Sequence, residues 1–262
     1  MMRCLYSAST GMKGQELNID VISNNLSNVT TTGYKKSRVD FQDLIYQTTK
    51  EPGSPIATGN AYPVGIQLGH GVRAVATQKI FSQGELQQTD APLDVIIQDK
   101  GFFQVQMPNG ETAYTRDGAW KLTSTGQVVT SDGYNVLPEL IIPQNAIGIN
   151  ITPSGIVGVK LPNQVDMQVV GQIETADFIN PAGLKAIGRN LLQASGSSGD
   201  PIVGIPGTQE LGELQQGFIE MSNVKVVEEM VNMIVAQRAY EANSKTIQTS
   251  DNMLQIANNL RR

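Results

Sequence analysis

Hydrophobic residues spaced seven apart at both ends of the chain constrain its fold more than any other feature. Near the N-terminus, one row is Leu5, Met12, Ile19 and Leu26, and a second row is Ala8, Gln15, Ile22 and Val29. A seven-residue repeat places side chains along one stripe of a helix, which is the pattern of a coiled coil. No proline lies between Arg3 and Val29, so this segment predicts a helix that ends near Gly33, a residue suited to a left-handed cap.

The C-terminal end repeats the pattern over a longer stretch. The row consists of Ile219, Val226, Met233, Tyr240, Ile247 and Leu254, with Met230 on the same side. No proline or glycine occurs from Asn223 to Leu260, so a second long helix is predicted there. Ser222 or Asn223 can cap its start, and Glu228 and Glu229 suit the positive end of the helix dipole.

The middle of the chain has the two-residue alternation of strands. Strands are expected at 93–97, 101–107, 112–116, 119–123, 127–130, 147–151, 157–161 and 167–173. The pairs Asn109-Gly110, Asp117-Gly118 and Asp132-Gly133 are strong hairpin signals. Two stretches rich in Gly and Pro, 51–71 and 195–212, are expected to be connectors.

These patterns predict an α+β fold in which long N- and C-terminal helices form a coiled-coil-like inner domain around a central antiparallel all-β domain. Residues 1–34 and 216–262 would together make a discontinuous helical assembly domain. Residues 35–90 would form an extended linker, and residues 91–215 the β domain with its Gly- and Pro-rich return loop.

The two helices cannot close their apolar seams by themselves, because a single pair leaves much apolar surface in water. Gly11 and Gly14 each weaken the first helix by about 1 kcal/mol relative to alanine, unless another backbone comes close there. We therefore hypothesise that both ends are loose in the monomer and become ordered by packing against neighbouring subunits. The alternative is a helix hairpin that lies on the β body of the same chain.

Composition argues against several classes of function. The net charge is −5, with scattered lysines and arginines, so the basic footprint of a nucleic-acid binder is missing. One histidine, His70, and one cysteine, Cys4, support neither a catalytic triad nor a transition-metal site. No apolar run is long enough to span a bilayer, and no signal peptide is recognisable. We expect no catalytic residue, cofactor, metal or small-molecule substrate.

Three blocks of sequence carry a family resemblance. Ser23 to Lys35, Leu93 to Gly118 and Gln216 to Lys245 are similar, in this order, to the motifs of the bacterial flagellar rod and hook protein family. Within them the family-motif residues are Asn24, Asn25, Leu26, Asn28, Thr32, Gly33, Tyr34, Ser222, Asn223, Glu228, Glu229, Arg238 and Tyr240. The linker from Tyr46 to Thr77 resembles that of the family branch that forms the distal rod, where it is thought to favour a straight, stiff tube over a bendable hook.

The resemblance implies a structural subunit that leaves through the flagellar export apparatus without a cleaved signal peptide. Copies would assemble into a straight helical tube in the periplasm that transmits motor torque to the hook. Proximal rod proteins and the hook protein would adjoin its ends, and peptidoglycan and outer-membrane rings would surround it. The interface residues expected from the seams are Leu5, Met12, Ile19, Ile22, Leu26, Val226, Met230, Met233, Tyr240, Ile247 and Leu254.

Two alternatives remain open from the sequence. A hook or proximal rod subunit would share the terminal motifs. A monomeric periplasmic β binding module would need a concave aromatic surface, which Phe102, Phe103, Tyr114 and Trp120 would have to supply. Core packing explains these four aromatic residues more simply.

Overall fold

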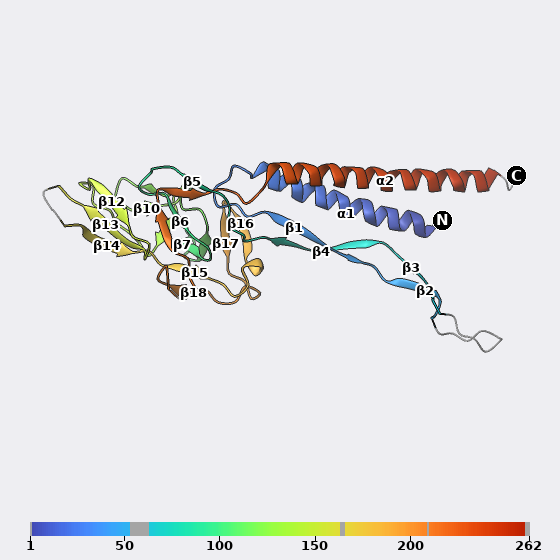
Figure 1. Cartoon of the computed structure of the whole chain (residues 1–262), viewed down its shortest axis with the longest axis horizontal. Coiled ribbons are helices and arrows are strands. Elements are labelled where there is room, and N and C mark those ends of the chain that lie inside the picture. The colour runs from blue at the N-terminus through green and yellow to red at the C-terminus, as the bar shows by residue number, and fades with distance from the viewer. Residues whose placement is uncertain (1, 53–62, 163–165, 209, 260–262) are drawn as a thin grey trace. The chain divides into compact units, whose positions relative to one another are not determined.

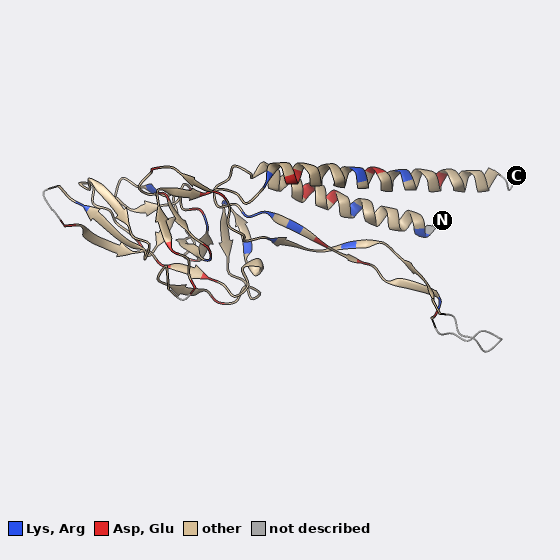
Figure 2. Ribbon diagram, viewed as in Figure 1, with Lys and Arg blue, Asp and Glu red and all other residues tan. Residues whose placement is uncertain are grey.

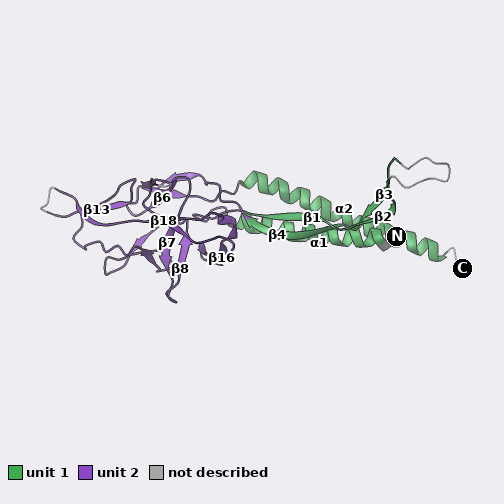
Figure 3. Ribbon diagram, turned by 90° about the horizontal axis from the view of Figure 1, so that it is seen from below, with its two compact units in different colours: residues 1–27, 37–78, 225–262 green, residues 28–36, 79–224 purple. Residues whose placement is uncertain are grey.

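The computed structural model describes residues 2–52, 63–162, 166–208 and 210–259. The chain divides into two compact units, coloured separately in Figure 3. The first unit contains residues 1–27, 37–78 and 225–262, and the second contains residues 28–36 and 79–224. These units divide the chain at other points than the three-part division predicted from the sequence. That division stays a prediction.

The first unit consists of two long helices and four strands. Helix α1 (Met2–Ser27) and helix α2 (Val226–Asn259) run side by side (Figure 1). Strand β1 (Ser37–Asp43) pairs with β4 (Val72–Lys79), and β2 (Tyr46–Lys50) pairs antiparallel with β3 (Ile66–Gly69). The two terminal helices pack on each other within one chain, which is one part of the hairpin alternative.

The two glycines of α1 allow close approach on different sides of the helix. A Cβ added to Gly11 would lie 2.9 Å from the side-chain nitrogen of Asn243 on α2. A Cβ added to Gly14 would lie 3.2 Å from the ring of Phe41 on β1. Both glycines therefore have close neighbours, but these are side chains of the same chain and not the other backbone that the sequence analysis expected.

The second unit is an antiparallel β structure. Its main sheet has the order β16-β17-β8-β7-β11-β10-β9, with β15 pairing both β7 and β18. The strands of this sheet are β7 (Phe102–Gln106), β8 (Thr112–Thr115), β9 (Lys121–Leu122), β10 (Val128–Val129), β11 (Asn135–Leu137), β15 (Thr175–Asp177), β16 (Lys185–Gly188), β17 (Leu191–Gln193) and β18 (Ile202–Gly204). A short 3-10 helix, η1 (Pro181–Gly183), follows β15.

Three smaller sheets complete this unit. They are β12-β13-β14 (Gly148–Ile151, Ile156–Lys160 and Gln168–Gln172), the pair β6-β19 (Val95–Ile97 and Leu214–Gln216), and the pair β5-β20 (Leu86–Gln88 and Phe218–Glu220). Every expected strand from 93 to 173 overlaps an observed strand. The antiparallel β character predicted for the middle of the chain is thus confirmed.

Two of the three apolar clusters of the second unit contain its buried aromatic residues. The larger cluster contains Phe103 and Trp120, whose rings meet edge to face 4.8 Å apart. The smaller contains Phe102, Tyr114 and Phe178, all of them buried. The four aromatic residues that could have lined a concave binding surface therefore lie in the core, as the packing interpretation expects.

Several local predictions from the sequence are wrong. Strand β8 pairs with β7 and β17 and not with β9, so Asp117-Gly118 does not form a hairpin turn. The stretch 195–212, expected to be only a loop, contains β18. Residues 53–62 of the first connector lie outside the described residues, but this connector also contains a strand, β3.

The helix ends also differ from the prediction. Helix α1 ends at Ser27, so Gly33 is not its cap. Gly33 is left-handed (φ +66°), and its N–H donates to the Glu220 carbonyl. A Cβ there would lie 2.7 Å from the backbone nitrogen of Asp117, so close packing explains this glycine. Helix α2 begins at Val226, three residues after Asn223.

Candidate assembly surface

Helices α1 and α2 meet along a stripe of α2 that is mostly small or polar. The stripe consists of Glu229, Ala236, Asn243 and Ser250, again spaced seven apart. Asn25 of α1 donates to Glu229 over 3.4 Å, Gly11 faces Asn243, and Ser250 donates to Cys4 over 3.4 Å. Since residue numbers rise along α1 as they fall along α2, the helices are antiparallel.

The apolar row predicted for α2 lies beside this contact stripe. Val226 and Tyr240 are exposed, while Met233, Ile247 and Leu254 are half-buried. Met230 is also exposed. On α1, Ile22 is buried, and Leu5, Met12, Ile19 and Leu26 are half-buried. Of the eleven predicted interface residues, three are therefore exposed, seven are half-buried and one is buried in the single chain.

The first turns of α2 carry an exposed apolar surface that the sequence analysis missed. Val227 is 76% exposed, Val231 53%, Ile234 56% and Val235 62%. Together with Met230, these residues make up what we call the outer α2 face. The sequence did contain a sign of this surface, because residues 230–236 are apolar at nearly every position. A helix that is hydrophobic on all sides is usually buried on all sides.

The outer α2 face changes character along the helix. Farther along α2 the exposed positions include Gln237, Arg238, Glu241, Lys245 and Gln248. Arg238 pairs with Glu241 over 3.2 Å on this polar part. An exposed apolar patch next to a charged region marks a site of protein contact more often than a free surface.

The family-motif residues lie in and near hydrogen-bonded clusters. In the first unit, the buried Asn25 side chain bonds both the N–H and the carbonyl of Ser37. In the second unit, Asn223 accepts from the N–H of Lys36 and donates to the carbonyl of Ile80. Neither Ser222 nor Asn223 caps the N-terminus of α2 in the described contacts. The Ser222 hydroxyl accepts a hydrogen bond from the N–H of Val224, which precedes the first residue of α2.

The remaining motif residues have varied environments. Asn24, Glu228, Arg238 and Tyr240 are exposed; Leu26, Asn28, Thr32, Gly33 and Tyr34 are half-buried; and Ser222 and Glu229 are buried. The side chain of Tyr34 packs under the ammonium of Lys79, 5.0 Å from the ring centre. The carbonyl of Thr32 accepts a hydrogen bond from Asn190.

A buried ionic cluster in the second unit, Lys35, Glu220 and Arg116, was not predicted. The Lys35 ammonium lies 2.5 Å from Glu220 Oε1, and Arg116 Nη1 lies 3.8 Å from Glu220 Oε2. Burial lowers the pKa of Lys35 below its usual range, although the nearby Glu220 carboxylate opposes this shift. Burial likewise lowers the pKa of Arg116.

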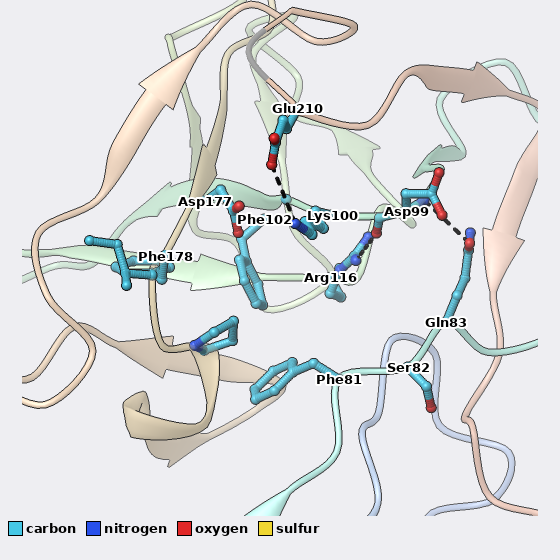
Figure 4. A pocket seen from close by; sticks show the side chains of 13 residues that line it. Phe81, Ser82, Gln83, Asp99, Lys100, Phe102, Arg116, Asp177, Phe178 and Glu210 are labelled. Atoms are coloured by element: carbon cyan, nitrogen blue, oxygen red, sulfur yellow. Dashed lines mark hydrogen bonds and ion pairs between the residues drawn. The ribbon is translucent and has the colours of Figure 1, made fainter.

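One hollow of about 580 Å³ opens in the second unit, lined by Phe81, Phe102, Phe178 and several charged residues (Figure 4). Its polar groups are largely engaged with each other. Lys100 pairs with Glu210 over 3.5 Å, and Arg116 donates to the backbone carbonyls of Ile97 and Asp99. The hollow thus offers few free groups to fix a ligand, which gives the binding-module alternative little support.

The described residues include no group of three or more His, Cys, Asp or Glu side chains that could hold a metal ion. His70 lies in a loop, with Nδ1 3.0 Å from the carbonyl of Ile45. Lys and Arg are interspersed with Asp and Glu over the described chain (Figure 2). Among its helices, none has the length and hydropathy of a membrane span.

Comparison with known proteins places these features in a family. Three family models match: flagella basal body rod protein over residues 5–35, flagellar hook protein FlgE/F/G D1 domain over 96–159, and flagellar basal body rod FlgEFG protein C-terminal over 215–260. The chain is 53% identical to the flagellar basal-body rod protein FlgG of Borreliella burgdorferi, with 100% of both chains covered. It is 48% identical to that of Caulobacter vibrioides, with 99% of this chain and 100% of the relative covered. For the FlgG of Bacillus subtilis the identity is 41%, with 100% of both covered.

Proposed function

Because the chain belongs to the FlgG family of flagellar basal-body rod proteins, we propose that its outer α2 face packs against neighbouring copies to build the rod. The chain is a structural subunit of the distal rod and not an enzyme. The observation that carries the proposal is the row of exposed valines and isoleucine on α2, opposite the stripe that contacts α1.

The energetics favour a further layer of contacts. Burying a valine or isoleucine side chain completely contributes about 1.5–3 kcal/mol. Val227, Val231, Ile234 and Val235 are each more than half exposed. Covering all four would therefore contribute roughly 4 kcal/mol to each subunit contact.

The predicted interface residues extend this surface. The half-buried residues Leu5, Met12, Ile19 and Leu26 on α1, with Met233, Ile247 and Leu254 on α2, flank the contact stripe. We assign them to contacts with a second neighbour. A helical assembly requires such heterologous contacts, because each subunit must present two different surfaces to successive copies.

The wider role of the subunit is inferred from its contacts with neighbouring copies in the rod. The assembled tube would transmit motor torque, with proximal rod proteins and the hook protein at its ends and the peptidoglycan and outer-membrane rings around it. Subunits would arrive through the flagellar export apparatus and add to the growing tip in the periplasm. The family membership supports this role over a binding module.

Polymerisation of purified subunits tests the proposal. Ile234→Asp places a carboxylate in the outer α2 face, where its desolvation costs several kcal/mol once the face is covered. We expect the concentration needed for tubes to rise at least about a hundredfold, since each 1.4 kcal/mol is a factor of ten. Gln248→Asp, at an exposed polar position two heptads farther along α2, is the matched control.

The two variants separate assembly from folding. Both should unfold in urea at the same concentration as the unchanged protein, because both sites are exposed in the single chain. Tubes of Ile234→Asp subunits at the normal concentration would refute the assignment of this face. Loss of tubes in Gln248→Asp alone would move the contact to the polar part of α2.

A further inference from the structure

A small hollow of the second unit gathers positive charge. It has a volume of about 190 Å³, and its lining includes Lys35, Lys79, Arg116 and Arg189. Among its described lining residues there is no aspartate or glutamate. All of the lining residues belong to the second unit, so the hollow is formed within that unit alone. The partners of each cation decide whether the hollow can hold an anion.

The two most buried of these cations already have counter-charges. Lys35 and Arg116 both pair with the carboxylate of Glu220. Asp99 and Asp177 also act on the charge of Arg116. These two cations therefore add positive potential to the wall of the hollow, but they have few donors left for a ligand.

Lys79 differs from them, because its described contacts include no carboxylate. The half-buried Lys79 places its ammonium 5.0 Å from the ring centre of Tyr34. Its hydrogen bond to the carbonyl of Lys35 is long, at 3.4 Å. Burial lowers the pKa of Lys79, and no described acidic group opposes this shift. Since an ammonium has three donors and a buried charge is normally paired, Lys79 has both donors and charge left for an anion.

The turn between β16 and β17 adds the fourth cation. Arg189 and Asn190 both have a left-handed backbone, with φ +54° and +58°, which is uncommon for residues other than glycine. The Arg189 guanidinium lies 5.9 Å from the ring centre of Tyr134 and donates to its hydroxyl. The nearby Asp117 carboxyl hydrogen-bonds with Thr32 and Asn190. The described contacts of Arg189 thus include no ion pair, and its charge adds to that of Lys79.

We propose that this hollow binds a small oxyanion, a carboxylate or a phosphate, through the free donors of Lys79 and the positive potential of Lys35, Arg116 and Arg189. The volume suits an ion of a few heavy atoms together with water, because one water occupies about 30 Å³. A bound oxyanion would supply the counter-charge that Lys79 lacks, and charged donors make the stronger hydrogen bonds to such groups.

This chemistry has two sources, a free ion in solution and an aspartate or glutamate side chain of a second copy. The net charge of −5 means that each copy offers more carboxylates than cations. The site lies in the second unit and the outer α2 face in the first, so the inference goes beyond the proposed function and does not depend on it.

Titration of the full-length monomer with inorganic phosphate, against chloride at equal ionic strength, tests the site. In the parent, the amide resonances of Gly188 and Asn190, which line the hollow, should shift and saturate. Lys79→Met keeps the length of the side chain and removes its charge. Its affinity for phosphate should fall at least about tenfold, because a hydrogen bond to a charged group is lost. Acetate, the carboxylate probe, should show the same loss.

A matched variant and a stability measurement separate binding from folding. Lys121→Met removes an exposed lysine of β9 in the same unit and should bind phosphate as the parent does. The urea midpoint of Lys79→Met should be unchanged or higher, because the substitution removes a partly buried charge that has no partner. A lysine with a purely structural role would give a lower midpoint and an unchanged affinity for phosphate, which would overturn the inference.

Tube formation in phosphate identifies the source of the oxyanion. If a carboxylate of a second copy fills the hollow, phosphate should raise the concentration needed for tubes in the parent and not in Lys79→Met. If the ion is free, that concentration should stay the same or fall. Shifts that do not saturate with either probe, or that saturate equally in Lys79→Met, would refute the site. The Ile234→Asp experiment is unaffected by any of these results, so the failure of one proposal is distinguishable from the failure of the other.

Discussion

Replacing Lys35 with methionine removes one partner from a buried ion pair. The side chains of Lys35 and Glu220 are 4% and 1% exposed, and their charged atoms lie 2.5 Å apart. The ammonium also donates to the carbonyl of Ser82 over 2.7 Å. Methionine keeps the length of the side chain but not its charge, so Lys35→Met leaves a buried carboxylate that has lost its nearest cation.

The magnitude follows from what still contacts Glu220. Removing one partner of a buried pair costs about 3–5 kcal/mol. Arg116 remains 3.8 Å from Glu220 Oε2, and the N–H of Gly84 still donates to Oε1 over 2.9 Å. We therefore expect a loss near the lower end, about 3 kcal/mol of unfolding free energy, for Lys35→Met.

A double-mutant cycle in urea checks this reasoning. Glu220→Gln keeps an oxygen for Gly84 and removes the negative charge, so the double variant Lys35→Met/Glu220→Gln contains no unpaired buried anion. Its loss should fall short of the sum of the single losses by about 2 kcal/mol. Unfolding can be followed by the fluorescence of Trp120, the only tryptophan. Losses that add to within about 0.5 kcal/mol would refute the coupling.

The same pair predicts a pH dependence. The folded-state pKa of Lys35 is lowered from 10.5 by burial, so the unfolded chain binds more protons between the folded-state pKa and 10.5. Stability due to this residue therefore rises with pH through that window. Below the folded-state pKa, the full cost of burying the charged ammonium is present. In Lys35→Met this rise should disappear, and urea midpoints measured across the window would detect it.

Two further substitutions test the packing and the predicted interface. Gly118→Ala should lower the free energy of unfolding by about 3 kcal/mol, because its Cβ would lie 1.7 Å from the carbonyl oxygen of Val95. Urea unfolding measures this loss. The control is Gly148→Ala, where a Cβ would have no neighbour within 4 Å. Ile247→Asp should prevent tube formation seen by electron microscopy without changing the unfolding of the β unit, and a straight tube of these subunits would contradict it.

Much of the β unit could be predicted because local pattern and tertiary environment agree there. Val157 and Val159 alternate with outward positions along β13, and both are buried as the alternation predicts. The Asn109-Gly110 turn joins β7 to β8 as a hairpin, because the turn residues and the flanking strands favour the same pairing. Asp117-Gly118 failed as a turn because β8 is paired on both sides by other strands, a preference that no local signal expresses.

The polar clusters could not be derived from the sequence for a different reason. Lys35 and Glu220 are 185 residues apart, and nothing in the sequence distinguishes them from the other lysines and glutamates of the chain. Only the fold selects which pair is buried. The resemblance marked Asn25 and Asn223 as motif residues, but it did not indicate which backbone groups they bind. The role of such side chains becomes clear only when the backbone groups that they bind are known.

The apolar repeat predicted for α2 and the stripe of α2 that contacts α1 have the same period but different phases. The first predicted residue of the row, Ile219, lies in β20 and not in α2. Within α2 the row begins at Val226, whereas the stripe that contacts α1 begins at Glu229, three residues later. A helix that packed only within its own chain would turn its largest apolar side chains toward α1. Here the small and polar row faces α1, and valines and isoleucine face outward. Small and polar contacts such as Gly11 with Asn243 and Asn25 with Glu229 can set the register of a helix pair at little gain in apolar burial. The larger apolar burial is then left for the contacts between subunits that we propose for the outer α2 face.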